Sequence, residues 1–565
     1  MKKKLVALIL GAGLMFTSCG KETALPKENT SQELESTEIE LEETKKEEAE
    51  QEDNEKKDVS DTGVETEKEA AVEIIYESEN DVITAPDGTE IYRYDYSYPV
   101  VTIKGNREAS EAIAKDQQQR KERFMEGSKE NQQTAEEGYN NNIEVEEDQD
   151  YFEGYSEDIS YRGERKDDKV ISFVSSYYAY LGGAHGSSYM EGVNYDVKTG
   201  KALTFEDIFT DREAAMEEIK AFMLEQCESP TFKSRLFPDY EDYLDDVLTD
   251  EYWYFSEEGI HVISNEYMLG TYAAGSFEFI IPYEELTELK EEYAYTGVYV
   301  YPVINGFTIE KDLDSDGQKE TICYSAIEPE PEIEVTEDGE EYSVYGGIEC
   351  SLKINDVDVT EQFLKLTEYI PESGYNYYYL TDLDENDNYI ELAILDYGMN
   401  DYSGTYFLRY DKGELKYLGY INSLLNSQMC EIKGDGTLKA RIHSQLLETA
   451  DLEGSYHIED GKLIFEEQDW YEYKRTEWAE EYMKNHNILK DVTVYTKNDI
   501  SSEKKILTSQ DGPVTFPATD NKNWVQVETA GGDTYYLYME SFGEINNDGV
   551  IENPMDVFED LLIAG

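Results

Sequence analysis

The apolar and polar positions divide the chain into a short apolar start, a long polar stretch and a folded remainder. Lys2, Lys3 and Lys4 precede an apolar run from Leu5 to Phe16. A basic start followed by an apolar run too short to span a bilayer is typical of a secretion signal. We therefore expect residues 1–18 to be a signal peptide.

The polar stretch has the composition of a linker. Residues 21–70 hold 19 acidic and 7 basic side chains and no aromatic one. Such a segment cannot bury enough apolar surface to offset the entropy lost on ordering. We expect residues 19–73 to form a disordered acidic tether that holds the later domains away from its attachment point.

Residues 74–292 carry the periodicities of a first folded module. The pattern predicts helices over Glu108 to about Asn131, Phe205 to about Glu225, and Tyr240 to Leu248. The predicted strands are Ile91–Ile103, Val170–Tyr180, Val193–Asp196, Trp253–Phe255, Ile260–Ser264 and Ser276–Pro282. This order of elements predicts an α+β domain with a mainly antiparallel sheet.

Short β-rich runs separated by turn residues fill the rest of the chain. We expect a β-rich domain over residues 300–475, a small β-barrel over residues 488–545 and a C-terminal tail over residues 546–565. After Cys19 no apolar run reaches about 18 residues, so no membrane-spanning helix is expected.

Charge and cysteine content argue against some classes of function. The 565 residues include 127 acidic and 48 basic ones, a formal net charge of −79, which argues against a nucleic-acid partner. Five cysteines and five histidines are few for a Cys/His metal enzyme or a dense disulfide framework. Cys323 and Cys350 both lie in strand-like runs of the β-rich domain, and a disulfide between them is left open.

The end of the apolar start resembles the bacterial lipoprotein signal. The residues concerned are Leu14 to Cys19, with Phe16 where that signal usually has leucine. The resemblance implies an acylated Cys19 and a protein anchored at the outer face of the bacterial cytoplasmic membrane, exposed to the cell wall. The alternative is an ordinary cleaved signal.

The first module contains an ordered set of short motifs. One loop holds Gly182, Gly183, His185 and Gly186, and Asn194, Asp196, Leu203–Phe209 and Tyr272–Gly275 follow. With this set, the module resembles the outer domain shared by RsiV-type anti-sigma factors and some peptidoglycan deacetylases, including the PdaC type. In RsiV-type proteins this domain binds lysozyme. The resemblance therefore implies lysozyme or another cationic protein as partner, which a strongly negative chain would attract.

The resemblance does not imply an enzymatic activity for this chain. The chain shows neither a cytoplasmic anti-sigma segment nor the metal-dependent deacetylase domain, so we expect a binding module and no enzyme. The alternative is a protein that binds or modifies peptidoglycan, including an unrecognised wall hydrolase. His185 would be either a ligand and proton carrier or a residue that fixes its loop by a backbone hydrogen bond, and we favour the second role.

Two acidic segments resemble the calcium loops of FG-GAP and VCBS repeats. In the first, Asp312, Asp314, Asp316 and Glu320 would bind through side chains and Gln318 through its carbonyl. In the second the ligands would be Asp382, Asp384, Asn386 and Glu391, although Asp387 stands where glycine is expected. We expect structural Ca²⁺, the alternative being turns in which carboxylates cap backbone N–H groups.

The C-terminal module resembles bacterial SH3-like domains. The similarity rests on the run Trp524 to Val527 before a glycine turn, with Tyr535 and Tyr536 where those domains usually show Gly-Trp. Trp524, Tyr535 and Tyr536 would line a groove for a cell-wall ligand, peptidoglycan. The alternative, which we favour, places Trp524 in the core.

Overall fold

The computed structural model describes residues 72–145, 154–327, 332–335, 341–344, 348–367, 376–396, 403–425, 430–474 and 485–562. The signal peptide, Cys19 and nearly all of the predicted tether lie outside these residues. All of the described residues belong to one of the two units into which the chain divides, residues 70–565. Within the described ranges, no helix combines the length and the apolar character that crossing a membrane requires.

A five-stranded sheet begins the described chain. Its strands lie in chain order, β1 (Val72–Thr84), β2 (Glu90–Ile103), β3 (Tyr155–Lys166), β4 (Val170–Tyr180) and β5 (Ser187–Asp196). All neighbours are antiparallel except β2 and β3, which are parallel. The crossover that a parallel pair requires contains helix α2 (Arg107–Val145).

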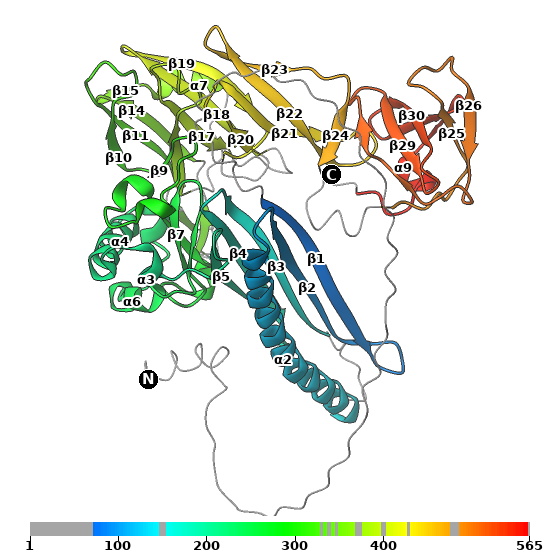
Figure 1. Cartoon of the computed structure of the whole chain (residues 1–565), viewed down its shortest axis with the longest axis horizontal. Helices are drawn as coiled ribbons and strands as arrows, with labels where there is room; N and C mark the ends of the chain where they lie inside the picture. Colours follow the sequence, from blue (N-terminus) through cyan, green and yellow to red (C-terminus); the bar gives the residue numbers. More distant parts are fainter. Residues whose placement is uncertain are drawn as a thin grey trace, which may run out of the picture. The chain divides into compact units, whose positions relative to one another are not determined.

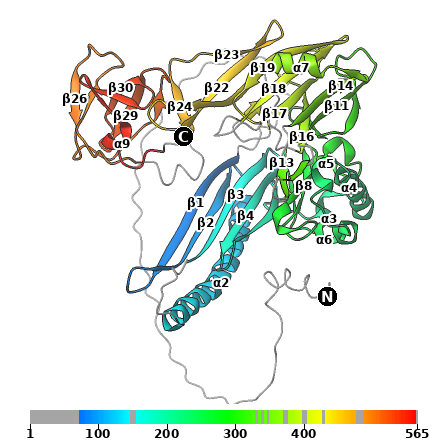
Figure 2. The same cartoon turned by 180° about the vertical axis from the view of Figure 1, so that it is seen from behind.

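Helix α2 covers one face of this sheet. It lies in front of the strands in Figure 1 and behind them in Figure 2. Ala109, Ile113 and Ala135 of the helix are buried, and Phe124 packs against the rings of Tyr94 and Tyr96. The helix continues past Gly127, beyond the predicted end near Asn131.

A three-stranded antiparallel sheet with short helices follows. The strands are β6 (Trp253–Phe255), β7 (Gly259–Ser264) and β8 (Phe277–Pro282), and the helices include α3 (Phe205–Ile208), α4 (Arg212–Cys227) and α6 (Leu244–Val247). The two sheets and their helices confirm an α+β region with mainly antiparallel strands.

The single helix predicted from Phe205 to Glu225 is wrong. The chain turns extended at Phe209, and Thr210 N donates a hydrogen bond to the carbonyl of Glu288 at 2.8 Å. Asp211 then begins a new helix by accepting a hydrogen bond from the amide of Ala214. The predicted helix over Tyr240–Leu248 is likewise a 3₁₀ turn followed by the four residues of α6.

The remainder of the chain is β-rich, as predicted. One sheet has the order β10 (Thr308–Lys311), β11 (Glu320–Ile327), β14 (Glu349–Ile354), β15 (Val357–Asp358). A second has the order β19 (Glu414–Ile421), β18 (Gly404–Asp411), β17 (Glu391–Asp396), β16 (Tyr377–Thr381), β9 (Val300–Ile304). Both sheets contribute buried side chains to one core around Leu352, Tyr378 and Leu392.

A third and larger sheet runs into the C-terminal module. Its path is β20 (Cys430–Ile432), β21 (Thr437–Ser444), β22 (Ala450–Glu459), β24 (Tyr471–Lys474), β28 (Ala518–Thr519), β29 (Trp524–Thr529), β30 (Thr534–Ser541), β25 (Val492–Tyr495), β26 (Lys504–Leu507). Pairing of β24 with β28 joins the two predicted modules. Among the described strands this path does not close into a barrel, so the SH3-like fold stays a prediction.

The Cys323–Cys350 disulfide is not formed, and both thiols are free. Strands β11 and β14 pair with Cys323 opposite Lys353 and Cys350 opposite Ala326. Side chains alternate between the faces of a sheet, so this three-residue offset places the two thiols on opposite faces.

Candidate functional site

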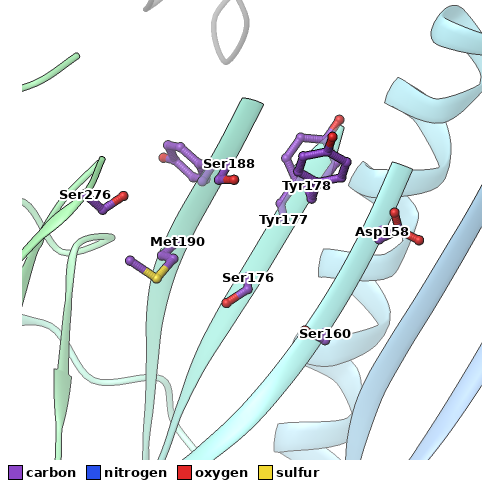
Figure 3. A pocket seen from close by; sticks show the side chains of 9 residues that line it. Asp158, Ser160, Ser176, Tyr177, Tyr178, Ser188, Met190 and Ser276 are labelled. Carbon is purple, nitrogen blue, oxygen red and sulfur yellow. The ribbon is translucent and has the colours of Figure 1, made fainter. Parts of the chain in front are cut away.

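A groove crosses β3, β4 and β5 on the face turned away from α2 (Figure 3). It has a volume of about 290 Å³ and is lined by Asp158, Ser160, Ser176, Tyr177, Tyr178, Ser188, Tyr189, Met190 and Ser276. Asp158 follows Glu157, which receives a hydrogen bond from Asn131 of α2. Because neighbouring side chains point to opposite faces of a strand, Asp158 faces the groove.

The groove combines acidic, hydroxyl and aromatic groups. Burial raises the pKa of the Asp158 carboxyl above its ordinary value, and the charge of Arg93 offsets part of that rise. Tyr178 is 42% exposed, so part of its ring is available to a ligand. Such a surface can accept hydrogen bonds and contact cationic or aromatic groups of a ligand.

Glu157 anchors the strands from the opposite face. Its carboxylate is 2% exposed and accepts hydrogen bonds from the hydroxyls of Tyr92 and Tyr177, both at 2.6 Å. Asn131 Nδ2 donates a third bond at 3.0 Å. Three donors compensate the buried charge and tie β2, β3, β4 and α2 together behind the groove.

The glycine-rich loop lies beside the groove and takes its shape from its glycines. Gly182 and Gly183 have φ of +83° and +108°, which favours glycine. A Cβ on Gly186 would lie 2.4 Å from the hydroxyl of Tyr178, so the glycine makes room for that ring. His185 Nδ1 lies 2.9 Å from the carbonyl of Gly186, the loop-fixing hydrogen bond that the sequence favoured.

Three aromatic rings continue from the loop. The ring of His185 stacks on Tyr272 with centroids 3.9 Å apart, and Tyr272 lies 6.0 Å from Tyr267. Tyr267 is 38% exposed. Together with Tyr178 these residues form an aromatic rim, a name used below for His185, Tyr178, Tyr267 and Tyr272.

Asn194 joins the two sheets of the first module. Its Oδ1 accepts hydrogen bonds from Ser172 Oγ at 2.6 Å and Phe255 N at 2.9 Å, and its Nδ2 donates to the carbonyl of Trp253 at 3.1 Å. A Cβ on nearby Gly192 would lie 1.6 Å from that carbonyl. Asn194 therefore has a structural role, since its hydrogen-bonding groups are used inside the protein.

Asp196 closes the turn that follows β5. Its Oδ1 accepts hydrogen bonds from the amide of Thr199 at 2.7 Å and from the Thr199 hydroxyl at 2.6 Å. Gly200 completes the turn with φ of +68°. Like Asn194, Asp196 stabilises the local fold and does not face the groove.

The first acidic loop brings three of its five predicted ligands together. Asp312, Asp314 and Glu320 each place one carboxylate oxygen within 4.8 Å of the others. Asp314 is 8% and Glu320 6% exposed, and Oδ1 of Asp312 and of Asp314 is buried without a hydrogen-bond partner. Asp316 instead accepts a hydrogen bond from the amide of Gln318, the turn that was the alternative to metal binding.

The second acidic loop does not assemble its predicted ligands into such a group. Glu391 is fully buried, and its Oε1 lies 2.7 Å from Nε of Arg409. Asp384 Oδ1 accepts hydrogen bonds from the backbone and side-chain nitrogens of Asn386. Within the described ranges, the first loop is the one acidic group with metal-ligand geometry.

The three aromatic residues of the predicted wall-ligand groove have different neighbours in the structure. Trp524 is 9% exposed and packs against Tyr495 and Tyr538, as expected of a core residue. Tyr535 accepts a hydrogen bond from Lys505, and Tyr536 lies 5.6 Å from Trp470.

Two protein families match the first module. The family described as "Deacetylase PdaC" matches residues 87–188, and "Protein of unknown function (DUF3298)" matches residues 206–284. The first module thus contains a region that matches a PdaC-type domain, followed by a region that matches a DUF3298 domain. This confirms the predicted kind of outer domain, while the lipoprotein, calcium-repeat and SH3-like resemblances stay predictions.

Two solved structures of DUF3298 proteins match part of the chain. One from Bacteroides fragilis shares 20% identity, with 40% of this chain and 95% of that one covered and a TM-score of 0.31. One from Pseudomonas aeruginosa PAO1 shares 12% identity, with 39% and 96% covered and a TM-score of 0.29. A search of curated proteins finds no match.

The groove draws on both matched regions. Asp158, Ser176 and Tyr178 lie in the PdaC-type match, and Ser276 lies in the DUF3298 match. The first acidic loop lies outside both matches. In the described part of the two matched regions, no group of three metal-ligating side chains is found.

Proposed function

We propose that this chain is a binding protein of the bacterial cell envelope whose PdaC-type and DUF3298 domains take up a cationic protein such as lysozyme. The observation that carries the proposal is the groove, where the Asp158 carboxylate and the exposed Tyr178 ring lie side by side in the cavity lining. Lysine and arginine side chains of a partner would pair with the carboxylate and stack on the aromatic rim.

The charge of the whole chain supports the same partner. A net charge of −79 attracts basic proteins over several ångströms and speeds their encounter, most strongly at low salt. Tyrosines at a protein surface supply large contact area at low entropic cost, which is why they are frequent in binding hot spots. Contacts in the groove would determine which cationic protein binds, and the net negative charge of the chain would increase the rate of association.

Calorimetric titration of the full chain with lysozyme at low and moderate salt tests the proposal. We expect binding at both salts, with affinity reduced about tenfold or more by Tyr178→Ala or Asp158→Asn, since hot-spot truncations cost more than about 1.4 kcal/mol. Tyr536→Ala in the C-terminal module and Asp556→Asn in the residues that follow it serve as aromatic and charge controls. Absence of heat at both salts, or equal losses in the controls, would refute this role for the groove.

Anchoring through Cys19 is part of the proposal, because it would place the groove where wall-active proteins act. The lipoprotein-like residues Leu14 to Cys19 support it. The second candidate is binding or modification of peptidoglycan, which the row of serine hydroxyls in the groove favours. Retention on isolated peptidoglycan without lysozyme binding, or turnover of peptidoglycan, would select that candidate.

We also propose that the first acidic loop binds a structural Ca²⁺. Three carboxylates within 4.8 Å of one another repel each other and are costly to bury unless a cation lies between them. Oxygen ligands on a short loop are those that Ca²⁺ prefers. Ca²⁺ should raise the melting temperature of the full chain relative to EDTA, Asp314→Asn should abolish that rise, and Asp316→Asn should leave it. An unchanged melting temperature of the natural chain refutes the site.

A further inference from the structure

The two acidic loops share one hydrogen bond between a backbone amide and a buried glutamate. In the first, the amide of Leu313 donates a hydrogen bond to Oε2 of Glu320 at 3.0 Å. In the second, the amide of Leu383 donates to Oε2 of Glu391 at 3.2 Å. Each loop thus ends in a buried glutamate that opens a strand and is held by the residue after the loop's first aspartate.

The loops differ in the cation available to that glutamate. Leu392 pairs with Leu408 across β17 and β18, which places Arg409 directly opposite Glu391. In the first loop, Lys311 lies opposite Glu320, but its Nζ lies 3.1 Å from Glu284. Within the described part of the chain, no ion pair joins a lysine or arginine to the first loop's three carboxylates.

Arg409 is held in the second loop by several contacts at once. Its Nη2 pairs with Oε1 of Glu391 and lies 2.9 Å from Oδ2 of Asp387, and its guanidinium lies 4.4 Å from the centre of the Tyr389 ring. The Arg409 side chain is only 10% exposed. A buried guanidinium is permanently charged and matches carboxylates with its fixed fork of donors.

Asp387 explains how the arginine is accommodated. It stands five residues after Asp382, and Gly317 stands five residues after Asp312. The position that is a left-handed glycine in the first loop, with φ of +86°, is thus a carboxylate in the second, where it supplies a further partner for Arg409. Asp387, which replaces the glycine expected in a calcium loop, is therefore also a residue that pairs with the Arg409 guanidinium.

We propose that the Arg409 guanidinium takes the place of a metal ion in the second loop, which is therefore a closed ion-pair site that binds no Ca²⁺ until the arginine is removed. Without Arg409, the carboxylates of Asp387 and Glu391, with the buried and unpartnered Oδ1 of Asp382, would supply oxygens for a divalent cation. The proposal goes beyond the first-loop site and stands or falls separately.

The two loops touch, so a change in either reaches one shared region. The amide of Ile390 donates to the carbonyl of Leu313 at 3.0 Å, and the amide of Lys412 donates to Oδ2 of Asp314 at 2.9 Å. A Ca²⁺ titration of the natural chain would mix the two sites. Asp314→Asn disables the first loop and leaves the second to be examined alone.

The test is Ca²⁺ titration by calorimetry and thermal melts of the full chain in EDTA and in millimolar Ca²⁺. Asp314→Asn alone should bind no Ca²⁺. Asp314→Asn with Arg409→Gln should melt lower in EDTA and gain a Ca²⁺-dependent rise and a binding heat. The control pairs Asp314→Asn with Arg441→Gln, an arginine on β21 that contacts Asp451 and the carbonyl of Asn422, and should gain neither.

Two results would overturn the proposal: Ca²⁺ bound by Asp314→Asn while Arg409 is present, or no Ca²⁺ response in a folded Asp314→Asn, Arg409→Gln chain. If the double variant does not fold, Arg409→Lys is examined in the Asp314→Asn background. A Ca²⁺ response of that variant would overturn the proposal, because a retained cation should keep the chain insensitive to Ca²⁺. A natural chain that binds no Ca²⁺ would refute the first-loop site alone.

Discussion

Replacing Glu278 with glutamine should lower the stability of the β6–β8 region and change how it depends on pH. Glu278 Oε1 lies 3.3 Å from His261 Nδ1, and Glu258 Oε2 lies 3.6 Å from Nε2. Tyr254 donates a further hydrogen bond to Glu278. Burial lowers the pKa of His261, but Glu258 and Glu278 outweigh it and raise that pKa to about 10.

The sign of the effect follows from that shift. A histidine whose pKa is higher in the folded than in the unfolded protein adds stability that is complete below the unfolded pKa of about 6.5. This stability is lost as pH rises through the folded pKa, about 10. Removing the Glu278 charge lowers the pKa of His261, so the variant should lose this contribution at lower pH than the natural chain.

The expected loss in the free energy of unfolding depends on how deeply the ion pair is buried. Breaking a fully buried ion pair costs about 3–5 kcal/mol, because the remaining charge is left uncompensated. The His261 side chain is 8% exposed, but that of Glu278 is 36% exposed, so water takes over part of the interaction. We expect Glu278→Gln to lower the free energy of unfolding by about 2–3 kcal/mol near pH 6 and by less as pH approaches 10.

Urea unfolding at intervals from pH 6 to 10, with calorimetric melting at each pH, measures this difference. Asp245→Asn is the matched control, because Asp245 lies 2.7 Å from Lys220 but is 81% exposed. Its loss should cost less than about 1 kcal/mol. If Glu278→Gln costs the same at pH 6 and pH 10, the reasoning that a protonated His261 is the partner is refuted.

Three further predictions concern packing, hydrogen bonding and anchoring. Gly192→Ala should lower the melting temperature strongly, since the new Cβ would lie 1.6 Å from the carbonyl of Trp253, and an unchanged melt would contradict this packing. Tyr177→Phe removes one of three donors to buried Glu157 and should cost about 1.5–3 kcal/mol in urea unfolding, whereas no measurable loss would argue against the bond. Cys19→Ser should abolish incorporation of labelled palmitate and release the protein from the membrane fraction; label on the variant would place the lipid elsewhere.

Much of the secondary structure could be predicted where apolar β-forming residues are continuous. The predicted bounds of β4, Val170–Tyr180, agree with the structure because its β-forming residues are nearly continuous, with Val, Ile and Phe in the buried first half and three tyrosines in the second. Strands β1 and β3 were missed, since charged residues such as Glu157 interrupt their pattern and only tertiary contacts compensate them. The break at Phe209 was missed for a similar reason, because its bridge to Leu289 joins residues far apart in the sequence.

Sites made of residues close in the sequence could likewise be predicted, whereas sites made of residues far apart in the sequence could not. Asp312, Asp314 and Glu320 could be predicted together because their spacing along one loop brings them near each other. Arg409 lies 18 residues from Glu391, and only the strand register shows that the two face each other. The groove likewise combines Asp158 with Ser276, which no local motif relates.

Asn194 lies between the two family matches, which end at residue 188 and resume at residue 206, and its hydrogen bonds reach into both of them. A cut after residue 188 would separate Asn194 from Ser172, and a cut before residue 206 would separate it from Trp253 and Phe255. Recombination that exchanged one domain for a foreign version would meet the same penalty. Within this chain, the two matched regions should therefore be kept together when variants are made, with β5 as the strand on which both depend.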